Sequence, residues 1–268
     1  MLTMSIQTRS KLNQLQHLLP EGLLVDSAWL QEHGYSRPLI AKYVRGGWLE
    51  SPVSRIYRRP KAREDGFTSW EEAVASLQTL LDLPFTVGGR TALELQGYAH
   101  YLALAGPTEI HLYGNAKPPK WLTCLPLKQK VVFHNANLFL NKKDLADDFN
   151  KQAWQTIYGT LVVSTPERAI LEVLDEIPQH ETFHQADMLM QGLTNLSPSR
   201  LNKLLADCRS IKVKRLFLWF ARRHNHPWFA RLNQNKIDLG SGKRMLVPGG
   251  QLDNKYLITV PKDLSTNG

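Results

Sequence analysis

The segment 180–184 reads HExxH, a pattern that could hold a metal ion. On a helix, its two histidines would lie on one face and bind zinc, while the glutamate would activate a water molecule. The extended form of this motif needs a glycine and a histidine where Asp187 and Met190 stand, and no glutamate follows Glu181. A third ligand would have to be an aspartate such as Asp187 or Asp207. A zinc hydrolase built on His180, Glu181 and His184 is therefore the least favoured alternative, and we expect no metal, no cofactor and no enzyme.

A second segment, Gly240–Arg244, resembles a phosphate-binding loop because its sequence is GSGKR. A Walker A motif needs a glycine where Ile237 stands and a serine or threonine where Arg244 stands. The segment fails at both positions. We interpret it as a tight turn between two strands, with Lys243 and Arg244 exposed.

Clustered basic residues are the third feature with a chemical meaning. The 268-residue chain has a formal net charge of +9. Residues 1–63 carry ten Lys or Arg and four Asp or Glu, which gives +6, whereas residues 64–199 carry −7 and residues 200–268 carry +10. Clustered Lys and Arg bind phosphates and release their counterions. The two ends are candidates for contact with a polyanion; the alternative is ordinary solvated surface.

Capping residues and periodicity predict the elements that would position the N-terminal charges. Apolar residues at helical spacing predict a helix over Ile6–Leu19. Asp26 can cap a short second helix, and Ser36 can cap a third with Pro38 in its first turn. Residues 48–59 then read as a β-hairpin. This order is that of a winged helix-turn-helix, whose recognition helix enters the major groove while its wing lies along the phosphate backbone.

The third helix of this module should have one buried and one basic face. Ile40 and Val44 share a face with the turn residue Tyr35, so the basic residues of the helix are expected to point outward. Trp48 and Tyr57 are expected in the core of the module.

The basic residues of the module are expected to have two roles on DNA. Arg37 and Lys42 lie in the first two turns of the third helix and are expected at base edges, whereas the remaining arginines are expected at phosphates. The alternatives are that these residues only increase solubility, or that the module binds a protein. The predicted DNA-binding residues are Ser36, Arg37, Lys42, Arg45, Arg55, Arg58 and Arg59.

The rest of the chain predicts a larger mixed α/β domain. Helices are expected after Ser69, after Ser164 with Glu167 as its capping-box partner, and after Ser197. We therefore expect an α+β protein, with a winged helix-turn-helix at residues 1–63 and an effector domain at 64–268. Strands are expected at Phe85–Val87, Ile110–Tyr113, Val131–His134 and Leu161–Val163, and within residues 237–247 and 255–260.

Residues 211–223, IKVKRLFLWFARR, predict an apolar helix with a basic edge. Most of this helix should lie in the core. Its edge is a candidate interaction surface, and the alternative is a solvated rim. The edge consists of Lys212, Lys214, Arg215, Arg222 and Arg223.

Cysteine usage and hydropathy bear on the compartment. Cys124 and Cys208 are far apart and form no CxxC pair, which argues against a disulfide framework and a four-thiolate zinc site. No apolar run approaches the roughly 18 residues that a membrane helix needs, and residues 1–16 are too polar for a signal peptide. We expect a cytoplasmic protein that contacts no membrane.

Several phrases of the sequence, in this order, resemble the AbiEi antitoxins of type IV toxin–antitoxin systems, which act in abortive phage infection. The resemblance spans nearly the whole chain. The phrases are GGWLESPVSRIYRRP, VGGRTALELQGYAHYL, VVSTPERAILEVLDEIP, VKRLFLWFARRHNHPWF, IDLGSGKRMLV and KYLITVP.

The resemblance implies an N-terminal domain that represses its own operon at inverted repeats, and a C-terminal domain that counteracts a toxin resembling the AbiEii nucleotidyltransferases. It would assign DNA binding to the seven residues above, and it carries no catalytic motif. Direct contact with the toxin stays open, so the alternatives are a stand-alone transcriptional regulator and an antitoxin that binds its toxin directly. No dimerisation helix is evident, so we expect a monomer that pairs on double-stranded promoter DNA.

Overall fold

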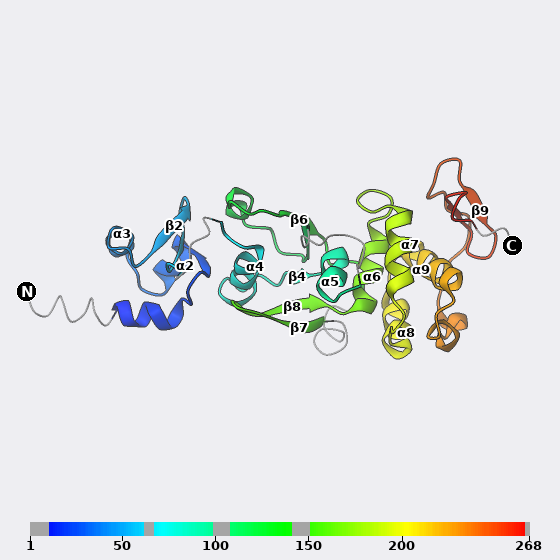
Figure 1. Cartoon of the computed structure of the whole chain (residues 1–268), viewed down its shortest axis with the longest axis horizontal. Helices are drawn as coiled ribbons and strands as arrows, with labels where there is room; N and C mark the ends of the chain where they lie inside the picture. Colours follow the sequence, from blue (N-terminus) through cyan, green and yellow to red (C-terminus); the bar gives the residue numbers. More distant parts are fainter. Residues whose placement is uncertain (1–10, 62–66, 99–107, 141–150, 266–268) are drawn as a thin grey trace, which may run out of the picture. The chain divides into compact units, whose positions relative to one another are not determined.

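The computed structural model describes residues 11–61, 67–98, 108–140 and 151–265. The chain divides into two compact units. Figure 1 labels helices and strands of both units. Unit 1 contains Met1–Phe85, Ala116–Val131 and Ala153–Leu161, and unit 2 contains the remaining segments. Helices and strands both contribute extensively, so the predicted α+β class is confirmed.

Unit 1 begins with the elements that the sequence predicted as a winged module. The described part of its first helix covers residues 11–18; the start expected at Ile6 lies outside the described residues. The predicted order of helices and hairpin is confirmed. A short strand before the second helix was not predicted, and it completes a three-stranded antiparallel sheet of order β1-β3-β2. The elements are β1 (Leu24–Asp26), α2 (Ser27–Glu32), α3 (Arg37–Arg45), β2 (Glu50–Val53) and β3 (Ile56–Arg58).

Local signals explain where α2 and α3 begin. The Asp26 side chain accepts a hydrogen bond from the Trp29 amide at 2.8 Å, as its capping role requires. Gly34, at φ +81°, reverses the chain after α2. Ser36 occupies the N-cap of α3 but makes no side-chain capping bond, and Pro38 lies in the first turn.

Unit 1 continues into α4 (Trp70–Thr79) and the short helix η1 (Lys120–Cys124). Ser69 caps α4 by accepting a hydrogen bond from the Glu72 amide at 3.2 Å. The Glu72 carboxylate does not turn back to the cap, because it pairs with Lys61 instead.

A five-stranded sheet of order β6-β5-β4-β8-β7 forms the second sheet of the fold, with β4 antiparallel to β5 and parallel to β8. Four of its strands were predicted to within two residues, whereas β7 was missed because half-exposed polar residues alternate along it. The strands are β4 (Thr86–Val87), β5 (Glu109–Tyr113), β6 (Lys130–His134), β7 (Lys151–Thr156) and β8 (Gly159–Ser164).

The helices of unit 2 pack around a core dominated by α6 and α9. The interior face of α9 buries Leu216, Phe217 and Phe220 completely, as its apolar sequence predicted. No helix in the described part of the chain is long and apolar enough to cross a membrane. The elements are α5 (Gly89–Leu95), α6 (Pro166–Asp175), α7 (Phe183–Gly192), α8 (Pro198–Asp207), α9 (Ile211–His224), η2 (Phe229–Arg231), η3 (Gln234–Lys236), β9 (Gln251–Asp253) and β10 (Ile258–Val260).

Two local predictions in this unit were wrong. The N-cap of α6 is Thr165, because the Ser164 hydroxyl turns inward and donates to Glu172 at 3.2 Å. The strand expected within residues 237–247 is an irregular loop with a single bridge between Arg244 and Ile258. The buried side chain of Arg215 donates to the carbonyl oxygens of Leu239 and Gly242, whereas the carbonyl oxygen of Arg244 accepts from the Thr259 amide of β10.

Candidate nucleic-acid interface

The helix α3 separates a buried face from a basic face. Ile40 and Tyr43 are buried, whereas the side chain of Val44, which was expected in the core, is only partly covered. Ser36, Arg37, Lys42 and Arg45 are all exposed, as predicted. Among the described residues, none forms a side-chain hydrogen bond or ion pair with the three basic side chains of α3. These cations are therefore available to a ligand.

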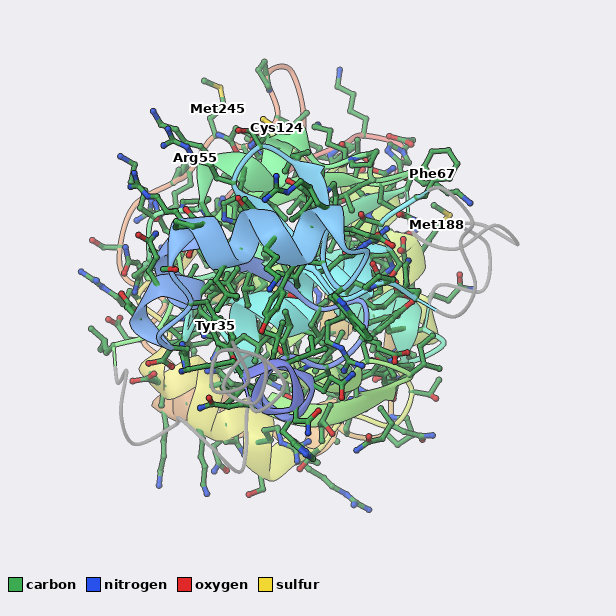
Figure 2. All side chains as sticks on the ribbon, turned by 90° about the vertical axis from the view of Figure 1, so that its left-hand side faces the viewer. Tyr35, Arg55, Phe67, Cys124, Met188 and Met245 are labelled. Atoms are coloured by element: carbon green, nitrogen blue, oxygen red, sulfur yellow. The ribbon has the colours of Figure 1, made fainter. Side chains whose placement is uncertain are left out.

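Tyr35 anchors the turn before α3. It is fully buried, and its hydroxyl donates to the Lys11 carbonyl oxygen at 3.1 Å (Figure 2). Burial, followed by the neighbouring Tyr43, raises the pKa of Tyr35 to about 12. This bond fixes the start of α3 against the first helix.

The hairpin β2–β3 places Arg55 at its tip. Arg55 has φ +65°, a left-handed conformation that is uncommon for a residue other than glycine, and its side chain is exposed (Figure 2). Its carbonyl oxygen accepts a hydrogen bond from the Ser27 amide at 3.0 Å. This hydrogen bond therefore fixes the turn, while the Arg55 guanidinium extends into solvent.

A groove of about 710 Å³ lies between α3 and the hairpin. The groove is lined by apolar side chains and by arginines from both α3 and the hairpin. This combination can accommodate a backbone whose phosphates meet the guanidiniums and whose sugars meet the apolar surface. The lining residues are Ser27, Arg37, Ile40, Ala41, Val44, Arg45, Ser51, Arg55 and Tyr57.

The structure corrects the role expected of Arg58. Its side chain is buried, its Nε donates to Glu50 at 2.9 Å, and its Nη1 lies 3.6 Å from Glu72. A guanidinium paired in this way is not free to bind a phosphate. The arginine-rich sequence of the hairpin could not reveal this, because Glu72 lies fourteen positions further along the chain.

Arg59 is also committed within the module. Its Nη1 donates to the carbonyl oxygens of Gln16 and Leu19, both at 3.2 Å, and its Nη2 lies 3.1 Å from Glu21. These bonds join the hairpin to the first helix. The expected phosphate contact of Arg59 is replaced by a structural role.

The two aromatic residues of the hairpin region also depart from expectation. Trp48 was predicted in the core, yet 48% of its surface is exposed. It follows Gly47, whose φ of +72° directs the chain from α3 into the hairpin. Tyr57 is half-buried and lines the groove, so one of its faces is accessible.

The basic side chains at the edge of α9 are buried or paired within the protein, so the structure gives the second site prediction no support. Lys214 and Arg215 are buried, and Arg215 donates to the carbonyl oxygens of Leu239 and Gly242 at 2.7 Å and of Leu257 at 3.3 Å. The other members of the edge, Lys212, Arg222 and Arg223, pair with Asp175, Asp253 and Asp187. Amphipathic spacing cannot distinguish such paired cations from free ones.

The residues of the HExxH segment do not share a helical face. Helix α7 begins at Phe183, after the capping residue Thr182, so His180 precedes the helix. Glu181 is nearly fully buried and accepts a hydrogen bond from Arg90 Nε at 2.7 Å, while His184 lies 2.6 Å from Asp263. Within the described residues, no three His, Cys, Asp or Glu side chains form a group that could hold a metal ion.

Unit 2 contains a buried histidine cluster that the sequence reasoning missed. His111 Nδ1 lies 2.9 Å from His134 Nε2, and His134 Nδ1 lies 2.9 Å from Glu176. Burial, followed by the charge of His134, lowers the pKa of His111 to about 4. The three residues lie on β5, β6 and just beyond α6, so only the sheet register could have brought them together.

Two family models match the chain and together cover most of it. Residues 8–104 match the transcriptional regulator, AbiEi antitoxin N-terminal domain, and residues 107–261 match the transcriptional regulator, AbiEi antitoxin of type IV toxin–antitoxin systems. No curated protein matches the sequence.

A solved structure supports the fold. The RV2827C protein from Mycobacterium tuberculosis aligns with a TM-score of 0.53 at 16% identity, over 92% of this chain and 89% of that one. At this identity the likeness concerns the fold alone. The match of the family models over both parts of the sequence is what shows that the chain belongs to the AbiEi family of antitoxin transcriptional regulators of type IV toxin–antitoxin systems.

Proposed function

We propose that the protein represses its own promoter by placing α3 in the major groove of double-stranded DNA and the β2–β3 hairpin along the phosphate backbone. The single observation that carries this proposal is the groove between α3 and the hairpin, which has Arg37 and Arg45 on one side and Arg55 on the other. Arg37 and Lys42 are assigned to base edges, and Arg45 and Arg55 to phosphates. Ser36 lies at the N-terminus of α3 and is assigned to the backbone.

Two copies are proposed to pair on inverted repeats, each bringing one α3 to a half-site. We propose that the part after the winged module counteracts a nucleotidyltransferase-like toxin of the AbiEii kind, without a catalytic step of its own, in the cytoplasm. The family description supports both the regulatory and the antitoxic role. The boundary at residues 63/64 stays a prediction.

Binding of the full-length protein to its own upstream DNA tests the proposal. Fluorescence anisotropy across a salt series should give tight binding to that DNA and weaker binding to a shuffled sequence. Lys42→Ala should reduce the difference in binding free energy between the upstream DNA and the shuffled sequence by roughly 1–3 kcal/mol, the usual value of one base contact. The matched control is Arg209→Ala, an exposed charge of unit 2, which should leave affinity unchanged. Equal affinity for both sequences would contradict sequence-specific repression.

A further inference from the structure

Glu72 of α4 is a fully buried carboxylate that faces the winged module. The Lys61 ammonium lies 2.6 Å from one of its oxygens, and the Arg58 guanidinium lies 3.6 Å from the other. Burying a carboxylate is costly unless cations compensate it, and removing either partner leaves a charge unpaired. Glu72 therefore holds the two basic residues at the base of the hairpin in fixed positions.

Arg58 transmits this restraint to both strands of the hairpin. It belongs to β3, and its Nε donates to Glu50 of β2 at 2.9 Å, directly opposite in the strand register. Its Nη1 lies 3.5 Å from the Thr68 hydroxyl. The guanidinium thus connects β2 and β3 to α4 and its preceding segment.

The backbone of the same sheet is bound to α4 as well. The Leu24 amide of β1 donates to the Ser76 hydroxyl at 2.7 Å, and that hydroxyl donates to the Glu72 carbonyl oxygen at 2.6 Å. Leu24 lies opposite Arg58 in the pairing of β1 with β3. Two independent contacts, one ionic and one through the backbone, therefore fix the sheet on the same turn of α4.

We propose that Glu72 is a positioning residue for DNA binding: it holds the hairpin, through Arg58 and Lys61, at the angle that brings Arg55 to the phosphate backbone. This inference rests on the proposed function. On this proposal the DNA-binding module would extend beyond the predicted boundary at residues 63/64 and include α4. Neutralising Glu72 would remove the carboxylate that pairs with Lys61 and one of the two that pair with Arg58, and would weaken the restraint on the position of the hairpin tip relative to α3.

A double-mutant cycle on the full-length protein tests this coupling. Glu72→Gln keeps the size of the side chain and removes its charge. DNA affinity is measured for Arg55→Ala, which reports on the hairpin, and for Lys42→Ala, the matched control on α3. In the otherwise unchanged protein, Arg55→Ala should weaken binding about tenfold, and in the Glu72→Gln background less than about twofold. Lys42→Ala should have the same effect in both backgrounds.

Three outcomes separate the possibilities. If the wild-type protein does not bind its upstream DNA, the proposed function fails and the inference falls with it. If it binds, but Arg55→Ala weakens binding equally in both backgrounds, only the inference is overturned. If Glu72→Gln reduces the effects of both Arg55→Ala and Lys42→Ala on DNA affinity, general destabilisation is responsible and the inference is also overturned.

A milder variant keeps the test valid if Glu72→Gln fails to fold. Glu50→Gln removes the other carboxylate of Arg58 at a partly exposed position. It should reduce the effect of Arg55→Ala on DNA affinity in the same direction, and leave that of Lys42→Ala unchanged. Independent effects of Glu50→Gln and Arg55→Ala would contradict the role of this ion-pair network.

Discussion

Basic residues that look equivalent in the sequence lie in different environments in the structure. Arg37, Lys42, Arg45 and Arg55 are exposed, whereas Arg58 and Arg215 are enclosed by carboxylates or carbonyl oxygens. A pattern of charge along the chain does not separate the two groups, because the partners of the enclosed residues lie at remote positions. The sequence therefore predicted where the basic surface of α3 is, and overestimated how many cations belong to it.

The backbone conformation of residue 55 favours glycine, whereas the proposed phosphate contact requires the side chain of Arg55. Arg55→Gly and Arg55→Ala both remove a proposed phosphate contact, so each should lower the salt dependence of DNA binding by about one counterion. Arg55→Gly should be more stable than Arg55→Ala by about 1 kcal/mol, because glycine adopts φ +65° without steric cost. Thermal unfolding and a salt titration check both statements. Equal stability of the two variants would contradict the strained turn.

Arg215 should matter for stability and not for DNA. Arg215→Met removes the side-chain donor to the carbonyl oxygens of Leu239 and Gly242 and one of two donors to that of Leu257, and should cost about 3 kcal/mol in the free energy of unfolding. Urea unfolding measures this, and Arg209→Met, on an exposed arginine, is the control. A loss below about 1 kcal/mol would show that the loop at 237–247 does not depend on Arg215.

At the scale of elements, local chemistry was sufficient for most of the fold. Asp26 and Ser69 cap α2 and α4 as expected, and the hairpin after α3 forms where its turn residues placed it. Elements that depend on remote partners escaped prediction. β1 is only three residues long and exists because β3 pairs with it, and the loop at 237–247 is ordered by Arg215 of α9.

The cluster of His111, His134 and Glu176 should make the free energy of unfolding sensitive to acid. The pKa of His111 is lowered to about 4 by burial and by His134, so the unfolded chain takes up its proton first. Burial raises the pKa of Glu176, but His134 and its neighbours outweigh this and lower it overall. Both groups contribute stability that is present at neutral pH. The His111 contribution should be lost as pH falls from 6.5 towards 4, and that of Glu176 below about 4.5.

Urea unfolding at pH 7.5, 6 and 5 checks this dependence. His111→Gln should flatten the decline in the free energy of unfolding between pH 6.5 and 5, whereas His17→Gln, at an exposed position, should not. An unchanged slope in the His111 variant would show that another group is responsible.

The whole molecule divides into two compact units, and the family description combines two roles, transcriptional regulation and antitoxicity. If the roles are separable, the double variant Arg37→Ala, Lys42→Ala should lose repression of a reporter behind its own promoter. It should still rescue cells from the neighbouring toxin, since neither residue lies in unit 2. Loss of both activities in a folded variant would show that antitoxicity requires DNA binding.

The decisive measurement is binding of the full-length protein to its own upstream DNA, compared with a shuffled sequence over a salt series. We expect sequence-specific binding that weakens as salt rises. Lys42→Ala should lose the preference for the upstream DNA, and Arg55→Ala should weaken binding to every sequence. Binding that is absent, or that is equally strong on both sequences and unaffected by either variant, would contradict the assignment of α3 and the hairpin to DNA.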